Sequence, residues 1–226
     1  MVIKRSKPPK TETLKMDKNS FRKLINIVLV VAVLGSWIAI FVSASGKLMH
    51  NGINSLKYFT VLSNLFEGAA SVIWLVSTRR NGRASAGAEL LKYIAAAAVG
   101  LTCVTVLVFL GPLYGYPAMF AGGSLYMHLL TPVVAIAEII FLSDFKYTRK
   151  DNRLVVLSPL IYGIFYLGNN IINGIGEWPD TNDWYLFLTW GYPVGVLIFA
   201  VICVVTWLLG LVMRKLTLGF RDEQGK

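Results

Sequence analysis

The chain has 226 residues, of which 55% are hydrophobic and only 15% are charged. Soluble domains carry about 25% charged residues, and the apolar residues here fall in long blocks, so the composition excludes an ordinary soluble domain and indicates an integral membrane protein. The net charge of +10 is compatible with a nucleic-acid partner, but the basic residues flank the apolar blocks, which is typical of membrane topology. We therefore expect no nucleic-acid binding.

A basic, polar segment precedes the first apolar block. Residues 1–20 are rich in Lys and contain the sequence KPPK, so they are expected to form a disordered tail. The small residues SASG at 43–46 resemble a signal-peptide cleavage site. The apolar run before them is longer than the core of a signal peptide, however, and this favours an uncleaved anchor.

Six apolar segments follow, each near the length of about 20 residues that a helix needs to cross a bilayer. They predict an all-α bundle of transmembrane helices at residues 21–44, 58–78, 90–111, 124–143, 154–174 and 193–213. Residues 21–213 would form one domain, followed by a C-terminal tail over 214–226 whose last residues, RDEQGK, are expected to be disordered.

The Lys and Arg residues divide unequally between the two sides of this predicted bundle. Of the 22, all except Lys47 and Lys57 fall before or just inside the start of the first span, between the second and third spans or just inside the start of the third, between the fourth and fifth, or after the sixth. Because cytoplasmic segments are enriched in Lys and Arg, both termini are predicted to be cytoplasmic. We expect a multi-pass membrane protein, with a bacterial cytoplasmic membrane as the favoured location.

The second span contains a row of polar side chains. Thr60, Asn64 and Glu67 are spaced by four and three residues, so they share one face of a helix. Polar side chains in hydrocarbon must find a partner or face water, and they are therefore candidate functional groups. The row predicts a buried polar site on this face of the helix.

Two other spans bring polar groups to a similar depth in the outer half of the membrane. His128 lies near the outer end of the fourth span, where Pro132 removes the helical hydrogen bond to its carbonyl group and should bend the backbone. The fifth span adds aromatic and amide side chains near its outer end: Tyr162, Tyr166, Asn169, Asn170 and Asn173. These three helices predict one outer pocket, whereas the inner halves look almost uniformly apolar.

The longest predicted outer loop, residues 175–192, mixes acidic and aromatic side chains. An aromatic belt at the membrane interface is the simpler interpretation. The alternative is a lid over the outward-facing pocket.

A hydroxyl beside an imidazole can act as a nucleophile with its general base. On this hypothesis His128 accepts the proton of Thr60 as the threonine oxygen attacks a carbonyl carbon. Asn64, Asn169 or Asn170 would donate to the oxyanion, and Glu67 would orient the imidazole or polarise the pocket. No metal-ligand cluster or nucleotide motif is visible, so neither a metal nor a cofactor is expected.

Each of these residues also has a purely structural interpretation. Thr60 could bond to its own helix backbone, His128 could join two helices, and Glu67 could be paired across the bundle or protonated. Glu138, deeper in the fourth span, is equally compatible with a structural and a proton-linked role.

Three stretches resemble a known family: KYFTVLSNL (57–65), YMHLLTPVVAIAE (126–138) and YGIFYLGNNIINGIGEWP (162–179). They look like the family of androgen-induced gene 1 protein and androgen-dependent TFPI-regulating protein, and especially like its bacterial membrane relatives, over about residues 24–213. The resemblance implies a six-helix membrane hydrolase that cleaves fatty acid esters of hydroxy fatty acids. It also implies Thr60 as the nucleophile and His128 as the base.

Two other functions stay open. A proton-coupled transporter would use Glu67, Glu138 and His128 as relay groups and needs a polar path that continues inward past Glu67. A sensor or scaffold would use the same bundle without catalysis. The hydrolase hypothesis needs Thr60 and His128 close together beside a lipid-sized cavity, with membrane lipids and a lipid ester as partners. The sequence does not decide the oligomeric state.

Overall fold

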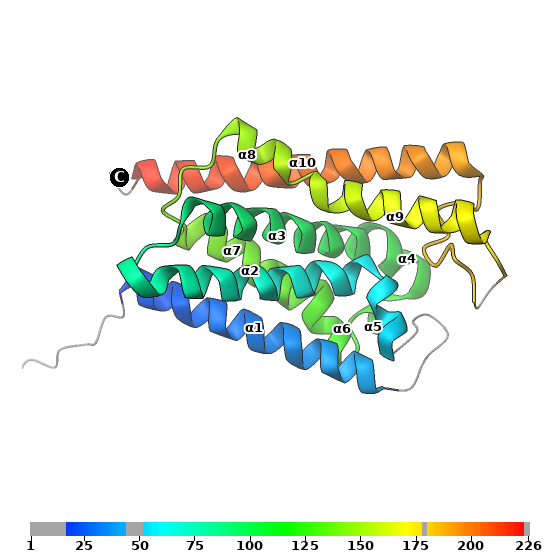
Figure 1. Ribbon diagram of the computed structural model, residues 1–226, viewed down its shortest axis with the longest axis horizontal. Coiled ribbons are helices and arrows are strands. Elements are labelled where there is room, and N and C mark those ends of the chain that lie inside the picture. Colours follow the sequence, from blue (N-terminus) through cyan, green and yellow to red (C-terminus); the bar gives the residue numbers. More distant parts are fainter. Residues whose placement is uncertain (1–16, 44–51, 178–179, 224–226) are drawn as a thin grey trace, which may run out of the picture.

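The computed structural model describes residues 17–43, 52–177 and 180–223, and these ranges contain helices and no strand. Six helical spans are long and apolar enough to cross a membrane, which confirms the predicted bundle. Figure 1 shows them as roughly antiparallel rods side by side.

Three of the spans are simple helices. They are α1 (Lys18–Val42), α2 (Phe59–Asn81) and α10 (Tyr192–Glu223). The third span joins α3 (Ala86–Thr105), the π-helical turn η2 (Val106–Leu110) and α4 (Gly111–Tyr114). The fourth joins α6 (Gly123–Leu125), η3 (Tyr126–Leu130), α7 (Thr131–Ala137) and η4 (Glu138–Leu142). The fifth joins α8 (Arg149–Leu154) and α9 (Leu157–Asn173), and the short helices η1 (Gly52–Lys57) and α5 (Tyr116–Met119) lie between spans.

Within the described residues, helix extends into both of the tails that are predicted to be disordered. Asp17 caps α1 by accepting hydrogen bonds from the backbone N–H groups of Asn19 and Ser20 at 2.9 and 3.0 Å. The hydrogen bonds from Ser20 hold the pKa of the Asp17 carboxyl group below its usual range. Residues 18–20 are therefore helical. At the other end α10 continues to Glu223, so the expected disorder is wrong for residues 221–223. The remaining tail residues, 1–16 and 224–226, lie outside the described residues.

The central helix of the bundle is α3, which contacts α2, α7, α9 and α10 (Figure 1). Its alanines at 95–98 are fully buried. Small side chains let neighbouring helix backbones approach closely, which is how helices pack when the surrounding lipid is as apolar as the protein. The run of alanines therefore explains why this helix occupies the centre.

Two of the π-helical turns directly precede a proline. Pro112 follows η2 and Pro132 follows η3, each as the second residue of the next helix. A proline has no N–H group to donate, so the preceding turn widens instead of continuing the regular α-helical ladder. The irregularity predicted at Pro132 thus takes the form of a π-helical turn, and His128 lies within it.

The two ends of the bundle differ in chemistry. The start of α1, the α2–α3 turn, the connection before α8 and the end of α10 lie at one end, here called the basic end (Figure 1). The opposite end, here called the cap end, carries η1, α4, α5, α6 and residues 174–177 and 180–191 (Figure 1). The first and last described residues both lie at the basic end, as an even number of crossings requires. The cytoplasmic location of this end stays a prediction.

Candidate functional site

Thr60 and His128 line the same cavity at the cap end of the bundle. Its volume is about 140 Å³, and its wall also includes Tyr114, Trp184 and Tyr185. The two side chains come from α2 and η3, which are separated by more than 60 residues in the chain. These two described side chains share the cavity without a hydrogen bond between them.

Thr60 is the second residue of α2, where backbone N–H groups have no partner in a preceding turn. The hydroxyl of Tyr185 accepts a hydrogen bond from the N–H of Phe59 at 2.9 Å and so stabilises this helix start. Within the described chain the hydroxyl of Thr60 makes no hydrogen bond, which argues against the interpretation that it only satisfies its own helix. A free hydroxyl at a helix N-terminus faces the positive end of the helix dipole.

The imidazole of His128 is held in one tautomer. Its Nδ1 lies 2.6 Å from the carbonyl oxygen of Met119, the last residue of the short helix α5 and part of the cavity wall. A carbonyl oxygen only accepts hydrogen bonds, so Nδ1 carries the proton and Nε2 keeps a lone pair. The ring therefore presents a proton acceptor rather than a donor at Nε2.

Two further cavities with mostly apolar walls lie between Thr60 and the surface of the bundle. Thr60, Leu110 and Tyr185 also line a second cavity of about 40 Å³, whose walls are otherwise mostly apolar. Leu101, Thr105, Phe187 and Ile202 are shared between that cavity and a third one of about 240 Å³. The third cavity is lined by Val108 and Trp190, which are 74% and 66% exposed, so it opens at the surface.

Residues 174–177 and 180–191, here called the cap loop, close one side of these cavities. Asp183 is 3% exposed, and its carboxylate accepts hydrogen bonds from the backbone N–H groups of Phe187 and Leu188 and from the hydroxyl of Tyr166. This buried carboxylate fixes the loop so that the next two residues, Trp184 and Tyr185, form part of the cavity wall. The geometry agrees with the lid interpretation of this loop.

The phenol of Tyr185 stays neutral over the whole physiological range. Burial raises its pKa to about 12. A neutral phenol retains its O–H group, so Tyr185 offers a hydrogen-bond donor to the cavity as well as an acceptor to the start of α2.

Tyr162 and the four candidate amides have mainly structural contacts. Tyr162 lines the apolar cavity beside Thr60 and donates to the carbonyl of Lys57. Asn64 donates to the carbonyls of Thr60 and Met127 at 2.8 and 3.1 Å, so its N–H donors point away from the cavity. The remaining amides lie outside the wall of the Thr60–His128 cavity: Asn170 is buried and donates to the carbonyls of Tyr166 and Asn182, while Asn173 donates to Asn169 at the exposed end of α9.

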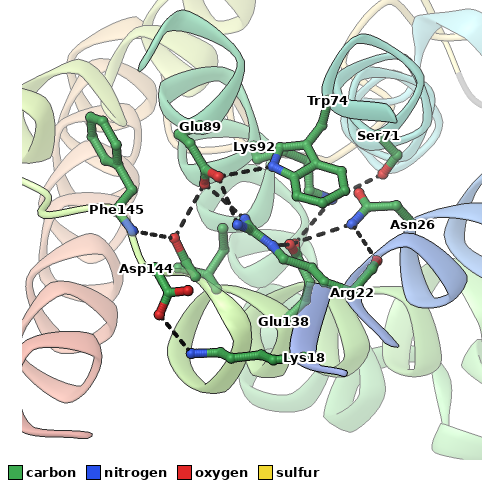
Figure 2. A network of polar contacts seen from close by, with 12 residues as sticks. Lys18, Arg22, Asn26, Ser71, Trp74, Glu89, Lys92, Glu138, Asp144 and Phe145 are labelled. Carbon is green, nitrogen blue, oxygen red and sulfur yellow. Dashed lines mark hydrogen bonds and ion pairs between the residues drawn. The ribbon is translucent and has the colours of Figure 1, made fainter. Parts of the chain in front are cut away.

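Glu67 does not share the cavity of Thr60. It lies in a buried group of ionisable side chains, here called the ion cluster, that consists of Arg22, Glu67, Glu89, Lys92 and Glu138. Figure 2 labels four of them, Arg22, Glu89, Lys92 and Glu138. Lys92 pairs with Glu67 and lies 3.3 Å from Glu138. The helices α1, α2 and α3 and the η4 turn of the fourth span each contribute at least one member.

Arg22 and Glu89 form the best-defined pair of the cluster. The guanidinium donates two parallel hydrogen bonds of 2.6 and 2.8 Å to the two carboxylate oxygens, and its Nε donates to Glu138. It also stacks over the ring of Trp74 at 4.5 Å, and the indole N–H of Trp74 donates to Glu89. Bidentate pairing with additional donors is the geometry that makes a buried ion pair tolerable.

The ion cluster corrects the expectation that the inner halves of the helices are almost uniformly apolar. Arg22 and Lys92 are expected among the basic residues that flank the spans. Instead they lie inside the bundle, where they are 4% and 0% exposed. A usable signal was present in the sequence, since both residues lie within predicted spans. Only the packing of the helices identifies the partners.

A polar cavity of about 560 Å³ reaches the ion cluster from the basic end. Lys18, Arg83 and Asp144 lie around it, and Arg22, Trp74 and Glu89 form the wall on the side of the cluster (Figure 2). Lys18 and Asp144 form an ion pair of 2.9 Å at this cavity. The cluster is therefore approached from the basic end and the Thr60–His128 cavity from the cap end.

Comparison with known proteins yields no relative. No family model, no curated protein and no solved structure matches this chain.

Proposed function

We propose that this protein is a membrane-embedded hydrolase that cleaves a lipid ester, with Thr60 as the nucleophile and His128 as the general base. The observation that carries the proposal is that the two side chains line one cavity, which shares wall residues with a neighbouring series of apolar cavities. The proposal agrees with the resemblance of the motifs around Thr60 and His128 to the androgen-induced gene 1 family.

The proposed reaction has two steps. Nε2 of His128 accepts the hydroxyl proton of Thr60 as Oγ1 forms a bond to the carbonyl carbon of the ester. His128 then returns the proton to the departing alkoxide as the bond from the carbonyl carbon to that oxygen breaks. A water molecule, deprotonated by His128, hydrolyses the acyl-threonine and regenerates the free hydroxyl. The bond from Nδ1 to the carbonyl of Met119 supports this role, because it keeps the lone pair on Nε2.

The oxyanion would be stabilised by groups at the start of α2. The helix N-terminus has a partial positive charge, and the neutral O–H of Tyr185 lies in the same wall as Thr60. Removing one oxyanion donor costs about 100-fold to 1,000-fold in rate in known hydrolases. These groups replace the asparagines of the sequence-based hypothesis, because Asn64 already donates to two carbonyls.

The apolar cavities support a substrate with acyl chains. The cavity that opens beside Val108 and Trp190 lies on the side of the bundle formed by α3 and α10, where exposed side chains are apolar. An acyl chain can enter there from the bilayer and reach Thr60 without crossing a polar surface. A polar substrate would gain nothing from such walls.

The decisive experiment is covalent labelling of the purified, detergent-solubilised protein with a fluorophosphonate probe. We expect labelling of the wild type, none in Thr60→Ala and at least 100-fold slower labelling in His128→Ala. Ser124→Ala is a matched control, since it removes a hydroxyl from the same cavity wall and should leave labelling unchanged. Labelling that persists in Thr60→Ala, or its absence from folded wild type, would contradict the proposal.

A proton-coupled carrier is the second candidate function, and one observation favours it. Buried polar atoms without a hydrogen-bond partner in the described structure continue inward from the Thr60 cavity: Oδ1 of Asn64, Oγ1 of Thr131 and Oε2 of Glu67. A carrier would move protons into liposomes loaded with a pH-sensitive dye, and Glu67→Gln would abolish this while leaving fluorophosphonate labelling intact. A wild-type protein that labels but moves no protons would exclude the carrier.

A further inference from the structure

The ion cluster contains more acids than bases. Among the described residues its members are three carboxyl groups, Glu67, Glu89 and Glu138, and two cations, Arg22 and Lys92. None is more than 6% exposed. An uncompensated charge in such surroundings is strongly unfavourable, and a buried group neutralises instead. The cluster therefore requires one further positive charge.

The hydrogen bonds indicate which carboxyl group takes this charge. Glu89 is saturated with donors, because the guanidinium of Arg22, the indole of Trp74 and the hydroxyls of Ser143 and Tyr147 all donate to it. Hydrogen bonds to a carboxylate favour its ionised form. Glu89 is thus the carboxyl group most firmly held as an anion.

Glu138 and Glu67 each have fewer donors than Glu89, and only Glu138 has contacts with both cations of the cluster. Glu138 accepts from Nε of Arg22 and, at 3.4 Å, from the amide of Asn26, and it lies 3.3 Å from Lys92. Glu67 accepts from Lys92 and Ser71 at one oxygen only. Its other oxygen, Oε2, is buried without any hydrogen bond, as is Oε2 of Glu138. A proton on Oε2 of Glu67 would turn one of these two unpartnered buried acceptors into a donor.

We propose that the ion cluster is a buried proton-binding site, in which Glu67 holds the exchangeable proton beside Lys92 and Glu138. With this proton bound the cluster is electrically neutral, and without it the cluster carries one net negative charge. The inference rests on other residues than the proposed hydrolase site, so it stands whether or not Thr60 is a nucleophile.

A proton fits this site better than a metal cation. The ammonium group of Lys92 already contacts Glu67, lies 3.3 Å from Glu138 and donates to Ser71 at 2.9 Å. A sodium ion among the same oxygens would lie against this ammonium and be repelled by it. A proton adds its charge within the carboxyl group itself and needs no additional space.

The basic end offers the route by which the proton exchanges. The polar cavity of about 560 Å³ ends at Arg22 and Glu89, directly beside the remaining members of the cluster. Every element that surrounds Glu67 contributes to its electrostatic environment: Arg22 from α1, Glu89 and Lys92 from α3, Glu138 from η4, and Tyr147 after η4. The site should therefore respond to pH on the side of the termini.

Infrared difference spectroscopy of the full chain in lipid vesicles tests the assignment. At neutral pH we expect the carbonyl band of a protonated carboxyl group, shifted by exchange into D₂O, present in wild type and lost in Glu67→Gln. Glu177→Gln is the matched control, because Glu177 is an exposed carboxyl group outside the cluster. A folded wild type without this band, a band retained in Glu67→Gln, or a band removed by sodium at constant pH would overturn the proposal.

Stability as a function of pH gives a second readout that does not depend on the spectrum. The native protein holds a proton that an unfolded glutamate releases at neutral pH, so the folding equilibrium constant should fall as pH rises, by up to about tenfold per pH unit. Glu67→Gln mimics the protonated form and should lose this dependence, whereas Glu177→Gln should keep it. Parallel curves for wild type and Glu67→Gln would refute the proton site.

Discussion

At the scale of single residues, the polar side chains of one helix serve two different sites. Thr60 and Glu67 lie on the same buried face of α2, being 8% and 0% exposed. Seven residues correspond to a rise of about 10 Å along a helix. This separation places Thr60 in the cavity at the cap end and Glu67 in the ion cluster, so that a single row of polar residues takes part in two sites.

The ion cluster predicts unequal costs for removing acidic side chains. Glu89→Ala should destabilise the protein by about 3–5 kcal/mol, because it leaves the buried guanidinium of Arg22 without its bidentate partner. Asp144→Ala removes the partner of Lys18 in an exposed pair and should cost at most about 1 kcal/mol. Thermal unfolding of both variants in the same detergent measures the difference. Equal losses would show that the Arg22–Glu89 pair has no special weight.

At the scale of elements, π-helical turns and the cap loop together build the Thr60–His128 cavity. The turn η3 carries His128, and the turn η2 ends at Leu110, another cavity residue. Such turns are frequent at functional sites because one wider turn re-aims the side chains that follow. The buried Asp183 then holds Trp184 and Tyr185 against these helices, so three separate elements must be in place before the cavity exists.

The contact between α9 and α10 provides a test at this scale. A methyl group at Gly163 would lie 2.8 Å from Cδ1 of Phe199, which lines the apolar cavity beside Thr60. Gly163→Ala should therefore displace this ring, at a cost of about 1–3 kcal/mol, and slow labelling by long-chain fluorophosphonates more than by short ones. Gly168→Ala is the matched control on the same helix, with no atom within 4 Å of the added methyl group.

The unfolding temperatures and labelling rates of the two alanine variants together test whether the cavity lined by Phe199 holds the acyl chain. Gly168→Ala should match or exceed the wild type in stability, since alanine is the better helix former. If Gly163→Ala behaves in the same way for long and short probes, the apolar cavity is not the acyl-chain site.

At the scale of the whole molecule, the bundle separates two chemistries at its two ends. The Thr60–His128 cavity is lined by the cap loop and adjoins apolar cavities, whereas the ion cluster is approached through a polar cavity at the basic end. A lipid and a proton would thus reach the protein from different directions. The prediction of cytoplasmic termini assigns the proton route to the cytoplasm.

Membrane orientation can be measured directly with single cysteines. In a background in which Cys103 and Cys203 are replaced by alanine, Glu177→Cys should react with an impermeant maleimide on intact cells. Lys150→Cys, exposed on α8, should react only after the cells are permeabilised. The opposite pattern would invert the orientation and with it the side from which the proton site is reached.

The sequence by itself determined the six spans, their order and the depth of Thr60 and His128. Long apolar blocks leave few alternatives to membrane helices, because every backbone polar group in lipid must be satisfied within the helix. Residue spacing likewise determined that Thr60, Asn64 and Glu67 share a face. Both kinds of inference depend only on positions along one helix, and the bundle confirms the spans while burial confirms the shared face.

Only the tertiary structure decided which polar groups meet. Lys92 and Arg22 lie near helix ends, where a long cationic side chain can extend to the membrane surface or turn inward to a carboxylate with similar local cost. The choice depends on acids that lie on other helices, up to 116 residues away in the chain. In the same way, Tyr185 reaches the start of α2 only because Asp183 folds the cap loop. These pairings arise from helix packing, which no local pattern encodes.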